Sequence, residues 1–139
     1  MNLRAQWAGV SRAKRFGIGF VFVWFFFGGL VHFVATDFDL HIMPPWVPAP
    51  RLVVYVSGVL ELLGAAGLLL AATRRWAGIG LFLLTLAVTP VHFYMLQVPE
   101  RFPEAPLWAL WLRLPIQAAL LACIAWSTWP RAVARSSAA

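Results

Sequence analysis

Residues 52–72, with the sequence LVVYVSGVLELLGAAGLLLAA, decide the fold. An apolar run of this length can cross about 30 Å of lipid hydrocarbon as a single helix. Glu61 is the only charged residue of the run, and it lies about nine helical residues from the start, close to the middle of the bilayer. The Thr73-Arg74-Arg75 turn that follows is so short that the next apolar run must return beside this one as an antiparallel hairpin.

Three further apolar runs lie on either side of this one in the chain. They cover residues 16–34, 76–96 and 107–129. The chain as a whole is 62% apolar and 12% charged, whereas a soluble domain is about 45–50% apolar and about 25% charged. This composition excludes an ordinary soluble domain. The four apolar runs predict an all-α protein, a four-helix transmembrane bundle within residues 16–129.

The basic residues predict how the bundle is oriented. Eight of them fall on one side of the predicted spans, with no acidic residue: Arg4, Arg12, Lys14, Arg15, Arg74, Arg75, Arg131 and Arg135. The opposite side holds four acidic residues and two basic ones: Asp37, Asp39, Glu100, Glu104, Arg51 and Arg101. Basic residues gather on the cytoplasmic side of membrane proteins, so both termini are expected there, as a basic segment at 1–15 and a tail at 130–139.

The net charge and the single cysteine limit the kinds of partner and site that this chain can have. The net charge of +6 does not predict a nucleic-acid partner, because the basic residues form neither a continuous stripe nor a known binding motif. Cys123 is the only cysteine, which excludes an internal disulfide, a covalently attached haem and a multi-cysteine metal site. The loops at 35–50 and 98–106 are rich in proline, so we expect stiff, extended caps on the outer side.

Four ionisable residues lie inside the predicted spans, one on each helix: His32, Glu61, His92 and Arg113. Such residues are costly in hydrocarbon and therefore face partners in the bundle interior. Ser57 precedes Glu61 by four residues and Gln117 follows Arg113 by four, so each pair shares a helix face. We expect a polar chamber in the outer half of the bundle, beneath the two proline-rich loops, and a packed inner half.

Several kinds of chemistry fit such a chamber. Glu61 and Arg113 could form a purely structural ion pair, and His32 and His92 could be axial ligands of a b-type haem. His32, His92 and Glu61 could hold a divalent metal, but single residues on separate helices show no ligand spacing, so no metal site is predicted. A quinone fits better: its tail can enter from the lipid, histidine or glutamine can bind its carbonyls, and a glutamate and a histidine can move its protons.

Several of these residues lie in segments that resemble a known protein family. The segments that carry it are Gly28-Gly29-Leu30-Val31-His32-Phe33, Ile42-Met43-Pro44-Pro45, Ser57-Gly58-Val59-Leu60-Glu61-Leu62-Leu63-Gly64 with Gly67-Leu68, and Pro90-Val91-His92. Together they resemble the DoxX-like membrane-protein family, over roughly residues 16–97. The resemblance implies a four-helix protein of the bacterial inner membrane. It also implies a link to quinone chemistry, since founding relatives are associated with the membrane subunit of a thiosulfate:quinone oxidoreductase.

The leading prediction is a multi-pass subunit that binds a quinone or similar lipophilic redox molecule and docks a redox partner protein. Glu61 would handle protons, Arg113 would be its charge partner, and the ligand would be bound by four polar side chains: His32, Ser57, His92 and Gln117. Any catalytic role would be that of a subunit of a quinone-linked oxidoreductase. The alternatives are a non-catalytic assembly subunit with a structural polar core, and a small-solute or proton permease. Self-association is left open, because no helix has a clear GxxxG face.

Overall fold

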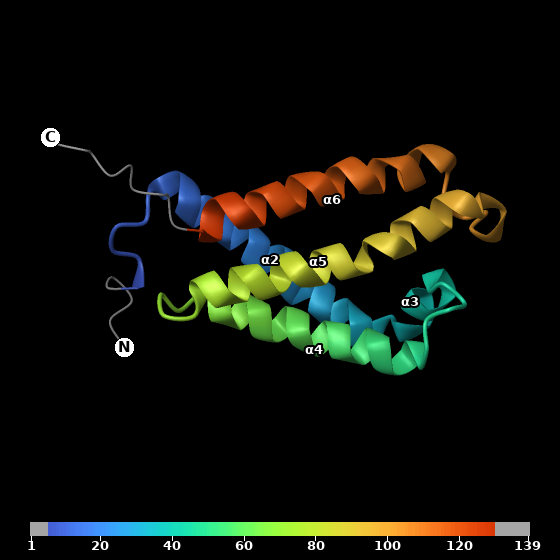
Figure 1. Cartoon of the computed structure of the whole chain (residues 1–139), viewed down its shortest axis with the longest axis horizontal. Coiled ribbons are helices and arrows are strands. Elements are labelled where there is room, and N and C mark those ends of the chain that lie inside the picture. Colours follow the sequence, from blue (N-terminus) through green and yellow to red (C-terminus); the bar gives the residue numbers. More distant parts are fainter. Residues whose placement is uncertain (1–5, 130–139) are drawn as a thin grey trace, which may run out of the picture.

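The computed structural model describes residues 6–129, and these residues contain helices and no strand. The four long helices are α2 (Arg12–Val34), α4 (Pro50–Leu68), α5 (Arg74–Gln97) and α6 (Leu107–Thr128), and the short ones are α3 (Thr36–Ile42) and the 3-10 turn η1 (Pro99–Arg101) (Figure 1). Each long helix is apolar enough to cross a membrane. The predicted all-α, four-helix bundle is confirmed, and the chain is a multi-pass membrane protein. The tail at 130–139 and residues 1–5 of the predicted N-terminal segment lie outside the described residues.

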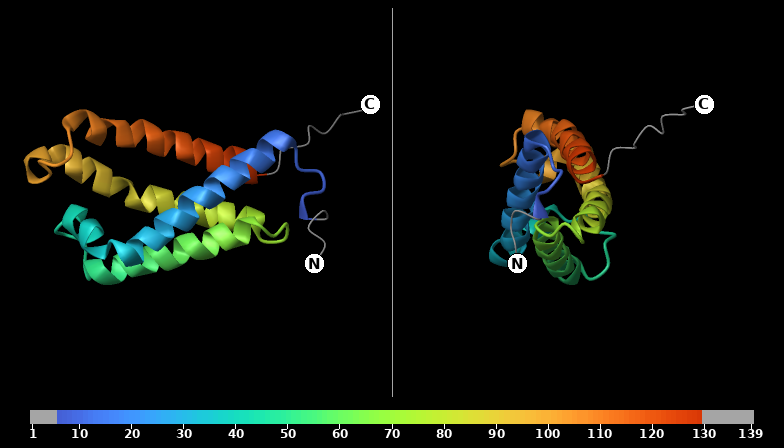
Figure 2. Two further views of the ribbon diagram at one scale, coloured as in Figure 1. Left: turned by 180° about the vertical axis from the view of Figure 1, so that it is seen from behind. Right: turned by 90° about the vertical axis from the view of Figure 1, so that its left-hand side faces the viewer.

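The long helices form a ring in the order α2, α4, α5, α6, in which each packs against its two neighbours (Figure 2). We call the end where α2 starts and α6 finishes the basic end, and the end with α3 and η1 the loop end. Lys14 on α2 donates from Nζ to the carbonyl oxygen of Trp129, directly after α6, at 2.8 Å. The helices lie close together at the basic end, whereas α3 and α4 separate from α5 and α6 at the loop end (Figures 1 and 2).

Helix α4 ends at Leu68, four residues before the predicted end of its span. Side chains that follow the helix capture its last carbonyl groups, which ends the regular hydrogen bonding. Thr73 donates from Oγ1 to the carbonyl of Gly67, and Arg74 donates from Nε to the carbonyl of Leu68, both at 2.8 Å. Helix α2 starts earlier than its apolar run, at Arg12, because the Ser11 side chain caps its first turn.

The first loop is not the fully extended cap that its prolines predict. Residues Thr36–Ile42 form helix α3, with Asp37 and Asp39 in its first turn, where carboxylates stabilise the positive end of a helix dipole. Thr36 Oγ1 also donates to the carbonyl of His32 at 2.8 Å, which ties α3 to the end of α2. The second loop is likewise not fully extended, because η1 forms a tight turn within it.

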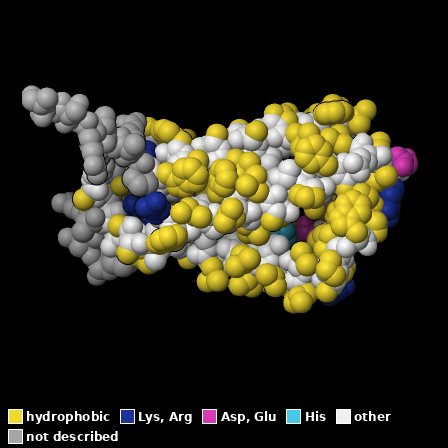
Figure 3. Space-filling model, viewed as in Figure 1, with side chains coloured by type: hydrophobic (Ala, Val, Ile, Leu, Met, Phe, Trp, Pro, Cys, Tyr) yellow, Lys and Arg dark blue, Asp and Glu magenta, His cyan; other side chains and the backbone are white. Residues whose placement is uncertain are grey.

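Apolar side chains pack into two separate cores, one toward each end of the bundle. The larger core, toward the basic end, comprises Ile18, Val21, Phe25, Ala65, Leu68, Leu81, Leu120 and Ile124. A smaller core at the loop end comprises Tyr94, Met95, Phe102 and Leu110. Phe102 comes from the second loop and is 1% exposed, so that loop is fixed by burial rather than by proline alone. Apolar side chains also cover much of the molecular surface, as expected for contact with lipid (Figure 3).

Helices α2 and α4 cross in direct backbone contact. A Cβ atom at Gly29 would lie 3.0 Å from the carbonyl oxygen of Gly58, and a Cβ atom at Gly58 would lie 3.0 Å from the carbonyl oxygen of Gly29. Only glycine lets the two backbones approach so closely. Gly29 and Gly58 therefore allow the close packing of α2 against α4.

Replacing Gly58 with alanine should destabilise the bundle by about 1–3 kcal/mol, because the new methyl group would overpack the crossing. It would lie 2.8 Å from Cε2 of Phe33 and 3.0 Å from Cβ of His32. Equilibrium unfolding of the full chain in mixed micelles measures this. Gly80→Ala is the matched control, since a Cβ atom at Gly80 would have nothing within 4 Å. Equal stability of the two variants would contradict the proposed role of the crossing.

Candidate functional site

Glu61 lies one helical turn beyond the crossing of α2 and α4. A Cβ atom at Gly28 would lie 2.8 Å from Glu61 Oε2, so the missing side chain at Gly28 makes room for the carboxylate against α2. The Glu61 side chain is 12% exposed. The two adjacent glycines thus have separate effects: Gly29 brings the helices together, and Gly28 accommodates the charged group.

His32 joins Glu61 to Asp39 in a short chain of side chains. Its Nε2 lies 3.3 Å from Glu61 Oε1, and its Nδ1 lies 2.8 Å from Asp39 Oδ2. A neutral imidazole has one N–H group, so two hydrogen bonds to carboxyl groups need a second proton. That proton makes His32 an imidazolium or makes one of the two acids a neutral carboxyl group. The cluster therefore stores a proton between α2, α3 and α4.

The expected ion pair between Glu61 and Arg113 is not formed. Within residues 6–129, His32 is the only basic side chain within 4.0 Å of the Glu61 carboxylate. The reason lies in the ring order, because α4 and α6 are diagonal to each other and a cavity lies between these two residues. Arg113 lines that cavity without an ion pair to any described residue.

Gln117 organises a second polar cluster between α5 and α6. Its Nε2 donates to the Thr85 carbonyl at 2.7 Å and to Thr89 Oγ1 at 2.6 Å. Because the Thr85 carbonyl can only accept, these contacts fix which end of the amide is nitrogen. Oε1 of Gln117 therefore faces His92, whose Nε2 lies 2.9 Å away and must donate.

This geometry defines the tautomer of His92. With its proton on Nε2, a neutral His92 has an unprotonated Nδ1 that can only accept a hydrogen bond. That Nδ1 is buried and has no partner among the described residues. Unpartnered polar atoms are uncommon inside proteins and often mark a place where a water, ion or ligand binds. His92 thus presents a base that is free to accept a proton or a hydrogen bond.

Two cavities meet at the middle of the bundle. One has a volume of about 420 Å³ and is lined from α2, α4, α5 and α6 by residues that include Trp24, Arg113 and Gln117. The other, of about 390 Å³, lies beneath α3 and the loop at 43–47. Glu61, Val88 and His92 line both. We call the two together the chamber; a histidine and an acidic side chain are visible in a hollow of the surface in Figure 3.

All six residues predicted for the site line this chamber. His32, Ser57, Glu61 and His92 line the cavity beneath α3, and Glu61, His92, Arg113 and Gln117 line the other. Sequence reasoning missed Asp39, which it placed in an extended outer loop. The signal was the acidic first turn of α3, since a helix that starts at Thr36 returns Asp39 to His32, seven residues earlier.

The same contacts test the haem and metal alternatives. Both ring nitrogens of His32 face carboxylates, and Nε2 of His92 is bound to Gln117, so the two histidines do not fit the role of axial haem ligands as arranged. Asp39 and Glu61 contact opposite nitrogens of His32 and do not converge on one point. Within residues 6–129 no group of three His, Cys, Asp or Glu side chains is arranged to hold a metal ion.

Nitrogen NMR of histidine-labelled protein should show His92 as the Nε2–H tautomer, because Gln117 offers it only an acceptor. The chain has three histidines, so the spectrum is simple, and His92→Phe assigns the resonances. We expect a protonated, pyrrole-type Nε2 and an unprotonated, pyridine-type Nδ1. A proton on Nδ1 alone would show that the Gln117 amide is oriented the other way.

His32→Phe should destabilise the protein by about 3 kcal/mol, because it leaves two largely buried carboxyl groups without their partner. His41→Phe is the matched control. Its partner Glu104 lies at 3.4 Å, but both side chains are more than half exposed, so the loss should be about 0–1 kcal/mol. Unfolding of both variants in mixed micelles compares them. Equal losses would mean that the His32 cluster is solvated and does not stabilise the fold.

A family model described as "Domain of unknown function (DUF8561)" matches residues 22–129, which include most of α2, the other three long helices and the whole chamber. No curated protein and no solved structure matches the chain.

Proposed function

We propose that this chain, which belongs to the DUF8561 family, binds a quinone or a similar lipophilic redox molecule in the chamber. The observation that carries the proposal is the meeting of two cavities at Glu61 and His92. Ligand sites in proteins combine apolar walls with a few converging polar groups. The chamber has this composition, and its polar groups are of the kind that bind and protonate a carbonyl or hydroxyl group.

The walls of the chamber suit an aromatic ring. Trp24 and Phe25 from α2 and Ile116 and Leu120 from α6 contribute apolar surface to the larger cavity. Arg113 lines the same cavity, and its guanidinium group can donate hydrogen bonds to a carbonyl oxygen. Because the surrounding surface is apolar and faces lipid, a ligand with a long hydrocarbon tail could leave that tail in the bilayer.

The Glu61–His32–Asp39 cluster would move protons for this ligand. A quinol that is oxidised releases two protons and passes two electrons to an acceptor, here a redox partner protein. Glu61 lines the chamber, His32 bridges the two acids, and Asp39 lies on α3 at the loop end. A proton taken up by Glu61 can therefore pass through the imidazole to Asp39, since each step joins groups within hydrogen-bond reach.

Location and partners follow from the same proposal. The basic end is assigned to the cytoplasm by the positive-inside rule, so the relay would open on the outer side of a bacterial inner membrane. The resemblance to DoxX-like proteins supports a role beside a quinone-linked oxidoreductase. Such a subunit would bind the lipophilic molecule and its protons, and the partner protein would carry the electrons.

Binding of short-tailed ubiquinone and of 2-methyl-1,4-naphthoquinone to the full chain in lipid nanodiscs tests the proposal. We expect saturable binding of one molecule per chain. Val88→Phe should weaken it at least about tenfold, because Val88 lines both cavities and a larger side chain would fill the place where they meet. Leu86→Phe on the same helix is the matched control, since Leu86 is 45% exposed on the surface.

Two results would contradict quinone binding. One is the absence of saturable binding to folded protein, and the other is equal binding by Val88→Phe and Leu86→Phe. Glu61→Gln adds a separate readout, because the amide keeps the shape of the side chain but cannot take up a proton. This variant should still bind the quinone, while the release of protons that accompanies oxidation of the bound quinol by an added one-electron acceptor, ferricyanide, should slow.

A non-catalytic assembly subunit is the second candidate. The observation that favours it is that the side chains of the His32 cluster hydrogen-bond one another and could serve only to fix the helices. Trp108 and Trp111 of α6 are 69% and 59% exposed and would supply the contact surface for a partner. Under this alternative, Trp108→Ala would weaken complex formation, whereas Val88→Phe would leave it unchanged.

A further inference from the structure

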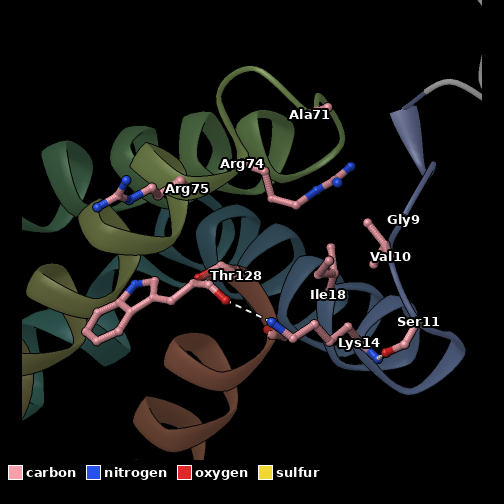
Figure 4. Close-up of a pocket in the computed structure, with 11 residues that line it drawn as sticks. Gly9, Val10, Ser11, Lys14, Ile18, Ala71, Arg74, Arg75 and Thr128 are labelled. Carbon is pink, nitrogen blue, oxygen red and sulfur yellow. Dashed lines mark hydrogen bonds between the residues drawn. The ribbon is translucent and has the colours of Figure 1, made fainter. Parts of the chain in front are cut away.

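A third cavity, separate from the chamber, lies at the basic end of the bundle (Figure 4). Its volume is about 370 Å³, and it lies between the start of α2, the turn before α5 and the end of α6. Lys14, Arg74 and Arg75 line it, together with the hydroxyl-bearing residues Ser11, Ser127 and Thr128. Cavities that bind small ligands have volumes of about 300–1,000 Å³, so this one can hold a compact polar group.

No carboxylate side chain balances the charge at this end. The chain has five acidic residues: Asp37, Asp39, Glu61, Glu100 and Glu104. Four of them lie in α3, η1 or the loop after η1, and Glu61 lies inside the bundle. Among residues 6–129, the basic end carries five cations and no acid; the five are Arg12, Lys14, Arg15, Arg74 and Arg75. The positive charge must therefore be balanced by something other than a described side chain.

Helix ends of both kinds lie at the basic end, because α2 and α5 begin there and α4 and α6 end there. Helices α2 and α5 both begin at the basic end, and neither has an acidic residue in its first turn. The N-terminus of a helix has a partial positive charge that favours anions and disfavours cations. Here Arg12, Lys14 and Arg15 lie in the first turn of α2, and Arg74 and Arg75 lie in that of α5. Lys14 and Arg74 donate to the last carbonyl groups of α6 and α4, so they already meet the negative helix ends, whereas the positive ends of α2 and α5 have no anionic partner among the described side chains.

Some of these cations are held in place by the protein itself, and others can bind a ligand. The Arg74 guanidinium donates to the carbonyls of Leu68 and Leu69 and lies 4.3 Å from the centre of the Trp7 ring, so it is held in place by the fold. Lys14 uses one N–H bond for the Trp129 carbonyl, shown as the dashed line in Figure 4, and keeps two others. Arg75 is exposed. Lys14 and Arg75 are therefore the groups available to a ligand.

Membrane orientation alone does not require this arrangement. Basic residues anywhere near the ends of the spans would set the topology, and Arg12 does so from outside the cavity. The cavity instead brings basic residues from two helices together with hydroxyl groups from a third. Lysine and arginine beside helix N-termini are the usual means by which proteins bind phosphate.

We propose that the cavity at the basic end binds a phosphate group, carried by an anionic phospholipid of the adjacent leaflet or by a soluble phosphate compound. Lys14 and Arg75 contact the phosphate oxygens, and Arg74 contributes its charge from a fixed position. The proposal is independent of quinone binding, because none of the residues that line this cavity line the chamber.

Native mass spectrometry of the full chain in detergent, with defined lipids added, tests this site. We expect the first phosphatidylglycerol to bind at least about tenfold more tightly than phosphatidylcholine, whose choline group neutralises the phosphate. The double variant Lys14→Gln/Arg75→Gln should lose this preference. Arg12→Gln is the matched control, because it removes a cation at the same end but outside the cavity. It should bind within about twofold of the unmodified chain.

Competition with pyrophosphate and ATP identifies the source of the phosphate. If either compound binds the unmodified chain, displaces phosphatidylglycerol and fails to bind the double variant, the site is a phosphate site for a soluble ligand. If only the phospholipid binds, the site belongs to the membrane.

Lys14→Arg/Arg75→Lys, which keeps both charges, is the folding control. It should bind like the unmodified chain, which would show that the loss in the double variant is not caused by misfolding. Equal binding of the two phospholipids, together with no binding of pyrophosphate or ATP, would overturn the proposal, as would unchanged binding by the double variant.

Discussion

Backbone contact between Gly29 and Gly58 fixes the geometry on which the chamber depends. Where α2 and α4 touch, His32 and Glu61 lie within hydrogen-bond reach of each other. The second carboxylate oxygen of Glu61 lies in the space that a side chain at Gly28 would fill. Larger residues at this crossing would move the two helices apart. The charged cluster would then lose its partners in a part of the protein where unpaired charge is costly.

The bundle combines apolar cores toward its two ends with a chamber whose polar groups are not all satisfied. The apolar cores toward the two ends hold the helices together, and the chamber lies between them. One side of the chamber carries a cluster whose side chains hydrogen-bond one another, and the other carries His92, whose Nδ1 has no partner, and Arg113, which forms no ion pair with a described residue. A structural polar core needs only the first of these. The second is what a ligand would use, and it therefore favours binding over a purely structural role.

The two ends of the bundle differ in how their charge is handled. At the loop end, basic and acidic side chains occur together, and Arg51 lies 3.7 Å from Asp37. At the basic end, the described cations other than Arg12 bond to backbone carbonyls or line a cavity. Carbonyl oxygens satisfy N–H donors but carry no net charge, so the positive field remains. The chain thus places a proton-carrying cluster toward one side of the membrane and a site for anions at the other.

The sequence by itself determined the four helices, because runs of apolar residues and the short Thr73-Arg74-Arg75 turn leave few other structures in lipid. It also identified the four ionisable residues of the spans that line the chamber, since ionisable side chains in such runs must face inward. Only the tertiary structure decided which of them are partners. The ring order places α4 diagonal to α6, so Glu61 binds His32 rather than Arg113, and helix α3 adds Asp39. Sequence spacing relates residues within one helix, whereas pairing between helices depends on crossing points that glycine packing sets in three dimensions.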